Sequence, residues 1–367
     1  MYFRFFVILI YMSKLDTTPY KGVRDFYPED LRIRKWLFSV WRNVAEKYGY
    51  VEYDASILEY ADLYKAKSGD EIVNEQTYTF KDRGDREVTL RPEMTPTVAR
   101  MVAQKKRELG FPLRWYSIPN LFRYENPQKG RLREHFQLNV DIFGDKTVNA
   151  DVEIISIAYE IMKAMGADDS QFEIRMNNYA GGQSSDFKTV IEMLGQVGIT
   201  NTLFDENLRR GQAYYTGIVF EIFDTSGENK RSIFGGGRYD NLLDIFGEEK
   251  VPAVGFGMGD VTARDFLETH KLVPELRSET DVVLLSMKNV DVSEVAKAMR
   301  VSRINVAVDA TEKDIPDKKR NAEKNSVPFY IVIGENELET GQFTLKNIFN
   351  KGEDFSGTIE EIINRLK

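Results

Sequence analysis

The chain has 367 residues, 42% of them hydrophobic, and it contains no cysteine. This length suffices for two domains that each bury a core of their own, and the lack of cysteine excludes disulfides, thiolate metal sites and cysteine nucleophiles. The formal net charge of −8 excludes a uniformly basic nucleic-acid-binding surface but permits a local basic face. We therefore expect a cytoplasmic protein with two domains.

Residues 1–11 are apolar, but the stretch is too short to span a membrane and no small-residue cleavage site follows it. Because Met12 resembles an ordinary start, we interpret residues 1–19 as an unstructured or mis-started N-terminal extension, with a signal or anchor as the alternative. No later stretch is apolar enough to span a bilayer, which predicts a protein without a membrane partner.

The pattern from residue 20 to residue 271 predicts mostly antiparallel strands flanked by helices, and hence an α+β domain. Helices are indicated by apolar residues three and four apart, and strands by alternation. In chain order the predicted elements are a helix over 30–48, a strand over 50–58, a helical or irregular segment around 61–67, a hairpin of 78–80 with 88–90, a helix over 97–109, a hairpin over 122–141, a helix over 148–165, a strand over 172–176, a loop over 179–186, a helix over 187–197, strands over 214–223 and 232–234, a helix through 242–245, a strand over 254–258 and a helix over 260–270.

A second domain is predicted after a linker over 272–279, which contains Pro274. Strands are expected over 282–286, 305–308 and 329–333, and helices over 292–299, 313–324 and 358–366. This alternation is typical of a small α/β domain with a mainly parallel sheet, here over residues 280–367.

The hairpin over 122–141 combines cationic donors with acceptor groups around a turn at 127–130. The residues concerned are Arg123, Arg131, Arg133, Glu125, Gln137 and Asp141. Planar guanidinium groups suit phosphates, and carboxylates and amides suit an amine or a ring nitrogen. Such a loop could hold a polyphosphate beside a cationic small molecule.

Five short segments stand out in chain order: Arg91-Pro92-Glu93-Met94-Thr95, residues 122–141, Arg210-Gly211-Gln212-Ala213-Tyr214-Tyr215-Thr216-Gly217, Gly236-Gly237-Arg238-Tyr239-Asp240 and Ala253-Val254-Gly255-Phe256-Gly257-Met258-Gly259. In this order they resemble the histidine-binding segment, motif 2, the histidine-specific motif and the approach to motif 3 of histidine–tRNA ligases, a class II aminoacyl-tRNA synthetase family. The resemblance runs from about Tyr20 to the C-terminus. It implies a class II catalytic domain and a C-terminal domain that binds the tRNA anticodon.

The resemblance also implies ATP and histidine as substrates, with Mg²⁺ accompanying the ATP and no metal bound by the protein. Forming an adenylate brings two anions together, which requires cationic side chains. Arg123 would hold the α-phosphate, Glu125 the adenine side and Arg131 the outer phosphates. Arg210 would lie between the histidine carboxylate and the α-phosphate, doing electrostatic work otherwise left to a metal ion. Arg123 and Arg210 are therefore the implied catalytic residues.

The resemblance places seven residues around the amino acid: Glu93, Thr95 and Gln137 at the α-ammonium, Asp141 and Tyr215 at the two ring nitrogens, and Tyr214 and Tyr239 in the pocket wall. An acceptor and a hydroxyl can engage both imidazole nitrogens at once. A site that satisfies both nitrogens rejects an analogue that lacks either one. Histidine tRNA and a second copy of the chain, forming a homodimer, are the other implied partners.

Several of these residues also have structural interpretations. Glu93 suits a helix N-terminus, Tyr214 and Tyr215 suit packing in a strand, and the glycines suit bulges or bends. Arg133 and Arg238 are interpreted as surface or structural ion-pair residues.

The two histidines, His135 and His270, have no partner at metal-ligand spacing, so no metal site is expected. We interpret His135 as a packing residue at a loop edge. In the second domain one predicted helix carries Lys313, Lys318, Lys319, Arg320 and Lys324. Both a solvated face and a tRNA contact remain open for this cluster.

Four features depart from the family pattern. Ser56 stands where the motif 1 strand normally has a proline at the dimer contact, and Ala213 replaces an acidic residue before the tyrosine pair. Thr262 occupies the place of the motif 3 arginine that covers the adenine, and Arg264 nearby would point differently on a helix. Only residues 179–186 lie where the family has a helical insertion that grips the tRNA acceptor arm.

These departures leave a second hypothesis open, a non-catalytic histidine-sensing paralogue that resembles the regulatory subunit of ATP phosphoribosyltransferase. The phosphate-binding arginines and the anticodon-binding domain favour the enzyme, because a sensor needs neither.

Overall fold

The computed structural model describes residues 15–65, 76–179, 182–210, 214–350 and 352–367. The chain divides into two compact units, Met1–Pro274 and Glu275–Lys367. The apolar residues 1–11, interpreted above as part of an extension, lie outside the described residues, as does Ala213.

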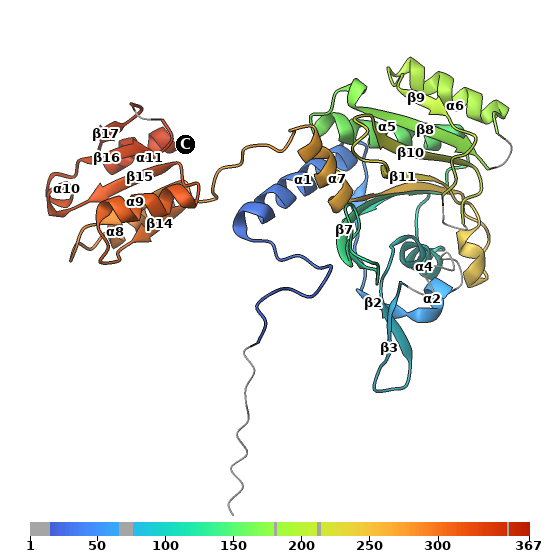
Figure 1. The fold of residues 1–367 in the computed structure, drawn as a ribbon, viewed down its shortest axis with the longest axis horizontal. Coiled ribbons are helices and arrows are strands. Elements are labelled where there is room, and N and C mark those ends of the chain that lie inside the picture. Colours follow the sequence, from blue (N-terminus) through green and yellow to red (C-terminus); the bar gives the residue numbers. More distant parts are fainter. Residues whose placement is uncertain (1–14, 66–75, 180–181, 211–213, 351) are drawn as a thin grey trace, which may run out of the picture. The chain divides into compact units, whose positions relative to one another are not determined.

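A nine-stranded sheet forms the centre of the first unit (Figure 1). Its strands lie in the order β1-β5-β7-β12-β11-β10-β8-β9, and β6 pairs with β7 beside this path. Their bounds are β1 (Val51–Glu52), β5 (Leu113–Ser117), β6 (Asn120–Phe122), β7 (Glu134–Phe143), β8 (Phe172–Asn178), β9 (Thr202–Phe204), β10 (Ile218–Asp224), β11 (Ser232–Arg238) and β12 (Ala253–Gly259). Only the outer pairs, β1 with β5 and β8 with β9, are parallel. The predicted antiparallel sheet is confirmed.

Helices share the core of one face of this sheet: α1 (Pro28–Lys47), α5 (Val148–Ala164), α6 (Ser185–Gln196) and α7 (Asp260–Thr269) (Figure 1). In α1 the buried residues Leu37, Trp41 and Val44 recur at helical spacing and so form one apolar stripe. From β7, Leu138 and Val140 enter the same core. Because side chains alternate along a strand, the odd-numbered residues of β7 point to the opposite face of the sheet, where no helix of this core lies.

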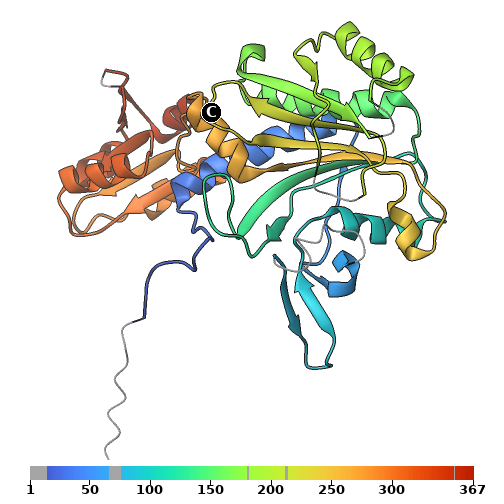
Figure 2. The same cartoon turned by 45° about the vertical axis from the view of Figure 1, so that its right-hand side comes forward.

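A three-stranded sheet in the order β2-β4-β3 lies beside the large one. Its strands are β2 (Leu58–Tyr60), β3 (Tyr78–Lys81) and β4 (Glu87–Leu90), which confirms the predicted hairpin. This hairpin extends away from the large sheet in both Figure 1 and Figure 2. Helix α2 (Ala61–Lys65) follows β2, and α4 (Thr95–Lys105) begins earlier than predicted because Pro96 is compatible with a first helical turn.

Three predicted elements differ in the structure. The strand predicted over 50–58 is broken into β1 and β2, and between them the Ile57 carbonyl accepts a hydrogen bond from the Arg91 amide. The strand predicted over 214–223 begins only at Ile218, so Tyr214 precedes it. The helix predicted through 242–245 is a short 3-10 helix, η2 (Leu242–Phe246). In addition, strand β9 lies in a segment for which no strand was predicted.

The second unit contains a five-stranded sheet in the order β14-β13-β15-β16-β17. Its elements are β13 (Val282–Ser286), α8 (Ser293–Val301), β14 (Val306–Asp309), α9 (Ile315–Lys324), β15 (Phe329–Ile333), α10 (Glu335–Thr340), β16 (Phe343–Asn347), β17 (Phe355–Gly357) and α11 (Ile359–Leu366). The α/β class is confirmed. The expectation of a mainly parallel sheet was wrong, because β16 and β17 pair antiparallel with their neighbours.

The basic cluster on α9 is not a continuous charged face. Lys318 is buried, and its ammonium donates to the carbonyls of Ser286 at 2.7 Å and Asp309 at 3.1 Å. Lys319 lies 3.8 Å from Glu323 and Arg320 lies 2.7 Å from Asp317. Burial therefore removes Lys318 from any basic surface, and nearby carboxylates partly offset the charges of Lys319 and Arg320.

Candidate active site

Two adjoining pockets lie on the face of the sheet to which the odd-numbered residues of β7 point. The inner pocket, of about 130 Å³, is lined by Glu93, Thr95, Arg123, Gln137, Asn139, Asp141, Arg210, Tyr214, Tyr215, Gly235, Tyr239, Gly255, Phe256 and Gly257. The outer pocket, of about 190 Å³, has Arg123, Glu125, Arg131, His135, Gln137, Arg210 and Thr262 among its lining residues. All eleven residues predicted for the site therefore line one pocket or both.

Glycines on β12 and β11 make room for the inner pocket. Gly255 pairs with Asp141 in the sheet register, and a Cβ atom at this glycine would collide with the Asp141 carboxylate. A Cβ atom at Gly257 would meet the Gln137 side chain at 2.9 Å, and one at Gly235 would collide with the Arg210 guanidinium. The glycines are thus required for close approach of pocket side chains, and not for a bend of the strand.

The inner pocket holds a buried carboxyl group between hydroxyl groups. The Tyr239 hydroxyl donates a short hydrogen bond to Asp141, and burial raises the pKa of Asp141 to about 7 although this bond lowers it. The Tyr214 hydroxyl lies 3.4 Å from Glu93 Oε2 and 3.5 Å from Thr95 Oγ1. The pocket therefore presents two carboxyl groups and several hydroxyl groups to one small ligand.

Replacing Asp141 with asparagine is expected to change how stability depends on pH. The native pKa of about 7 lies above the ordinary 3.8, so the native protein keeps a proton that the unfolded chain loses. This contribution to stability is full below pH 3.8 and is lost as the pH rises through 7, at up to about 1.4 kcal/mol per pH unit. Asparagine mimics the protonated form, so D141N should gain stability relative to wild type as the pH increases.

Urea unfolding at several pH values measures this difference, with the exposed Asp25→Asn as the control. Parallel pH profiles for D141N and wild type would show that Asp141 is ionised in the native protein at neutral pH.

Two arginines form the wall that the inner and outer pockets share. Arg123 donates from Nε to the Pro92 carbonyl at 2.8 Å, which ties the hairpin to the segment that carries Glu93. Arg210 donates to Glu221 Oε1 at 2.8 Å, and its guanidinium carbon lies 5.6 Å from the centre of the Tyr215 ring. Both guanidinium groups can thus contact a ligand group that bridges the two pockets.

The outer pocket is cationic apart from one carboxylate. Glu125 lies 3.4 Å from Arg131 Nε and 4.0 Å from Arg123, and its buried Oε2 accepts no hydrogen bond from the described part of the chain. His135 lies on β7 with its side chain in this pocket, and burial together with Arg123 and Arg24 lowers its pKa to about 3. The interpretation of His135 as a packing residue at a loop edge was wrong, because β7 begins before it.

Sequence reasoning missed three residues of the site, namely Asn139, His135 and Glu221. The first two follow from strand alternation, since they share a face of β7 with Gln137 and Asp141. No sequence signal pairs Glu221 with Arg210, because this contact joins a strand to a segment outside it.

Other predicted alternatives are resolved by contacts. Arg238 is buried and forms an ion pair of 2.5 Å with Asp151, so its structural interpretation is confirmed. Arg133 donates to the Tyr20 hydroxyl at 2.7 Å and lies over the Tyr124 ring, and it lines neither pocket.

Comparisons with known proteins show the family and the fold to which the chain is similar. A family model described as histidyl-tRNA synthetase matches residues 22–180 and 179–260, and one described as an anticodon binding domain matches residues 281–367. The histidine–tRNA ligase of Leptospira biflexa is 38% identical over 430 residues, covering 97% of this chain and 98% of that protein. The ligase of Thermoplasma volcanium is 34% identical over 420 residues, covering 95% and 97%. The apo histidyl-tRNA synthetase of S. aureus superimposes with a TM-score of 0.81 at 26% identity, covering 97% of this chain and 100% of that one.

The antiparallel sheet, its pocket-lined face and the following α/β unit define a class II aminoacyl-tRNA synthetase fold. Within this class, the chain belongs to the histidyl-tRNA synthetase family.

The comparisons also bear on the helical insertion of the family, in whose place this chain has only residues 179–186. The alignment with the L. biflexa protein spans 430 positions, more than the 367 residues of this chain, so that relative contains segments that are absent here. The two matched segments of the family model meet at residues 179–180, within the loop predicted over 179–186.

Within the described ranges, no helix is both long and apolar enough to cross a membrane. Nor do those ranges bring three His, Cys, Asp or Glu side chains together as metal ligands.

Proposed function

We propose that the protein activates histidine with ATP and then transfers it to the terminal ribose of histidine tRNA in the cytoplasm. The observation that carries this proposal is the wall of Arg123 and Arg210 between the inner pocket, which would take the amino acid, and the outer pocket, which would take the polyphosphate. A reaction that joins a carboxylate to an α-phosphate needs its cations at such a junction, where the charge develops.

In the first step, a carboxylate oxygen of histidine forms a bond to the α-phosphorus of ATP, and the bond from that phosphorus to pyrophosphate breaks. Arg123 and Arg210 would stabilise the negative charge on the phosphoryl oxygens, and Arg131 would hold the departing phosphates. In the second step, a ribose hydroxyl of the tRNA attacks the carbonyl carbon, loses its proton, and AMP leaves.

Histidine would be recognised from both ends in the inner pocket. Glu93, Thr95 and Gln137 would hold the α-ammonium. Asp141 would accept from one ring nitrogen, and Tyr215 would engage the other. Tyr214 and Tyr239 would orient the two carboxyl groups through the hydroxyl contacts described above. This arrangement favours an imidazole because it pairs both ring nitrogens, and an analogue that lacks one would leave a buried group unpaired.

Mg²⁺ would enter with the ATP phosphates, since it prefers carboxylate and phosphate oxygens and keeps several waters. The outer pocket fits this role through Glu125, whose buried Oε2 accepts no hydrogen bond within the described residues. The ion would neutralise charge on the outer phosphates. The second unit, which matches an anticodon binding domain, would bind the tRNA anticodon.

Histidine-dependent exchange of pyrophosphate into ATP tests the proposal directly. The purified protein is expected to catalyse exchange with histidine, and not with buffer or with glutamine as the amino acid. Histidine binding without any exchange would contradict the proposal and support the histidine-sensing alternative.

We propose further that the protein forms a homodimer through one face of the three-stranded sheet. Two rows of apolar residues cross this face in register, Leu58 with Leu90 and Tyr78, and Tyr60 with Val88 and Phe80. None of the six is buried in the single chain, and Leu58, Tyr60 and Phe80 are about half exposed at 48%, 58% and 48%. A contiguous apolar patch of this kind is typical of an interface, and a second copy would cover it.

The double variant Tyr60→Asp/Phe80→Asp is expected to be monomeric, because two buried and unpaired carboxylates would oppose association. Sedimentation velocity at micromolar concentration measures this, with the exposed Thr79→Asp on the opposite face of β3 as the control. A wild-type protein that sediments as a monomer would contradict the proposed dimer.

A further inference from the structure

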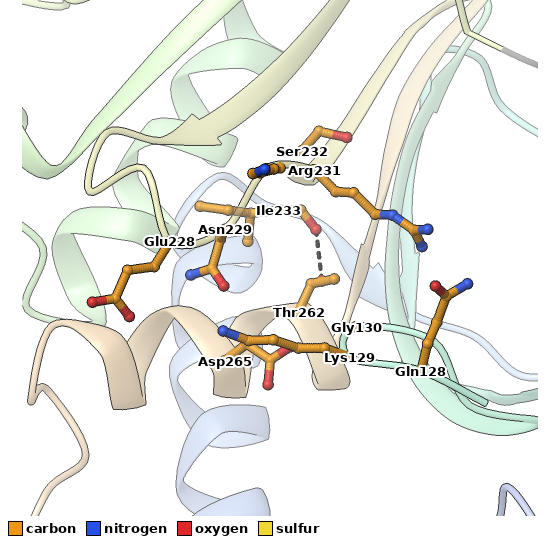
Figure 3. Close-up of a pocket in the computed structure, with 11 residues that line it drawn as sticks. Gln128, Lys129, Gly130, Glu228, Asn229, Arg231, Ser232, Ile233, Thr262 and Asp265 are labelled. Atoms are coloured by element: carbon orange, nitrogen blue, oxygen red, sulfur yellow. Dashed lines mark hydrogen bonds between the residues drawn. The ribbon is translucent and has the colours of Figure 1, made fainter.

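A third cavity, of about 400 Å³, adjoins the outer pocket (Figure 3). It lies between the turn of the β6–β7 hairpin, the loop before β11 and the first turns of α7, and it shares Gly130, Ser232, Ile233 and Thr262 with the outer pocket. The two spaces therefore lie side by side along these four residues. The outer pocket alone, at about 190 Å³, is smaller than the roughly 300–1,000 Å³ of most ligand sites, whereas the two together fall within this range.

The side chain at the floor of this junction is too short to cover a ligand. Thr262 Oγ1 lies 2.6 Å from the Ile233 carbonyl and 3.2 Å from the Gly259 carbonyl, so the hydroxyl is held down against the backbone (Figure 3). Arg264 cannot replace a longer residue here, because it pairs with Glu268 at 2.5 Å and lines a different pocket. The face of a ligand above Thr262 would be open unless another element covers it.

Three cationic residues line the third cavity, Lys129, Lys230 and Arg231. The charge of Lys129 acts on Asp265, where it opposes the rise that burial causes in the pKa of that carboxyl. Arg231 is exposed and has no hydrogen-bond or ion-pair partner within the residues that the structure describes. Figure 3 shows its side chain extending from the start of β11 toward the side of the cavity where Gln128 lies.

We propose that Arg231 covers the base of ATP at the junction between the outer pocket and the third cavity. This inference rests on the proposed function. Because Arg123 and Arg210 line both the inner and the outer pocket, the α-phosphate would lie at that end and the base at the far end, beside the third cavity. Ile233 and the Thr262 methyl group would form an apolar floor under the ring, and the planar guanidinium of Arg231 would stack on its upper face. Arg231 is then a specificity-determining residue supplied by the loop before β11.

Calorimetric titration of the full-length protein with ATP tests this assignment. Arg231→Ala is expected to weaken ATP binding by about ten-fold, the loss of one stacked cation. Arg231→Lys keeps the positive charge but lacks the planar guanidinium group that stacks on the base. This variant should therefore bind ATP nearly as weakly as the alanine variant. Lys230→Ala, which removes only a neighbouring charge, should change ATP affinity by no more than about two-fold. Because Arg231 is exposed and has no partner among the described residues, these variants should fold as wild type does.

Inorganic tripolyphosphate separates a contact with the base from a contact with the phosphates. Its affinity is expected to be equal for wild type and Arg231→Ala. Equal losses for ATP and tripolyphosphate would overturn the proposal and assign Arg231 to the phosphates. Unchanged ATP binding by Arg231→Ala would also overturn it, while leaving histidine activation intact. Failure of the wild-type protein to bind ATP would overturn the proposed function and this inference with it.

Discussion

Replacing Arg210 with alanine is expected to abolish histidine-dependent ATP–pyrophosphate exchange while histidine affinity stays within a few-fold of wild type. Arg210 lines both pockets, and its guanidinium is held by Glu221 at 2.8 Å and lies against the Tyr215 ring. It can therefore stabilise charge that develops between the two substrates without reorganising. Removing one such preorganised donor costs about 10²–10³ in rate, and removing a full charge at the reacting phosphate should cost at least as much.

The exchange rate at saturating histidine and ATP measures this loss, and calorimetric titration measures histidine affinity. Arg209→Ala is a matched control, because Arg209 donates to the Glu206 and Leu208 carbonyls and lines neither pocket. Full exchange activity in R210A would show that Arg210 has no catalytic part. A large loss of histidine affinity without a loss of rate would instead assign it to amino-acid binding.

Replacing Gly255 with alanine is expected to reduce histidine affinity by about 100-fold, equivalent to the loss of a buried, charge-assisted hydrogen bond. The new methyl group would collide with the Asp141 carboxylate and meet the Val140 carbonyl at 2.6 Å. The carbonyl belongs to the neighbouring strand and cannot move alone, so Asp141 must leave the position in which Tyr239 holds it. Overpacking of this kind also costs stability, by about 1–3 kcal/mol.

Gly259→Ala on the same strand provides the control, because its methyl group would have no heavy atom closer than Thr262 Oγ1 at 3.6 Å. Titration with histidine gives the affinities, and thermal unfolding shows that both variants are folded at the temperature of the titration. Wild-type histidine affinity in G255A would mean that Asp141 does not contact the ligand in the position it occupies here.

Much of one wall of the site was predictable because it is local. The residues of β7 are read from a single strand, so alternation alone places Gln137, Asn139 and Asp141 on one face. The same rule would have placed His135 in the outer pocket, had the strand been extended to Glu134. The helix boundaries of α1 and α5 were likewise set by local stop signals at Gly49 and Gly166.

Other features were not predictable because they depend on partners far away in the sequence. The glycines of β12 have two local interpretations, bend or close approach, and only the pairing with β7 distinguishes them. Lys318 looks like part of a charged helix face until β13 and β14 bring carbonyl groups to its ammonium. The roles proposed for the site residues stay predictions until the substrates have been tested.

By itself, the sequence determined the chemistry of each segment and most of the local elements, since residue types, spacing and stop signals act over a few positions. It also determined the family, because five segments occur in a specific order. The tertiary structure alone decided that Arg123 and Arg210 share a wall, that Glu221 holds one of them, and that Thr262 leaves a cavity beneath Arg231. The physical reason is the strand order β7-β12-β11-β10, which places segments side by side that are far apart in the chain.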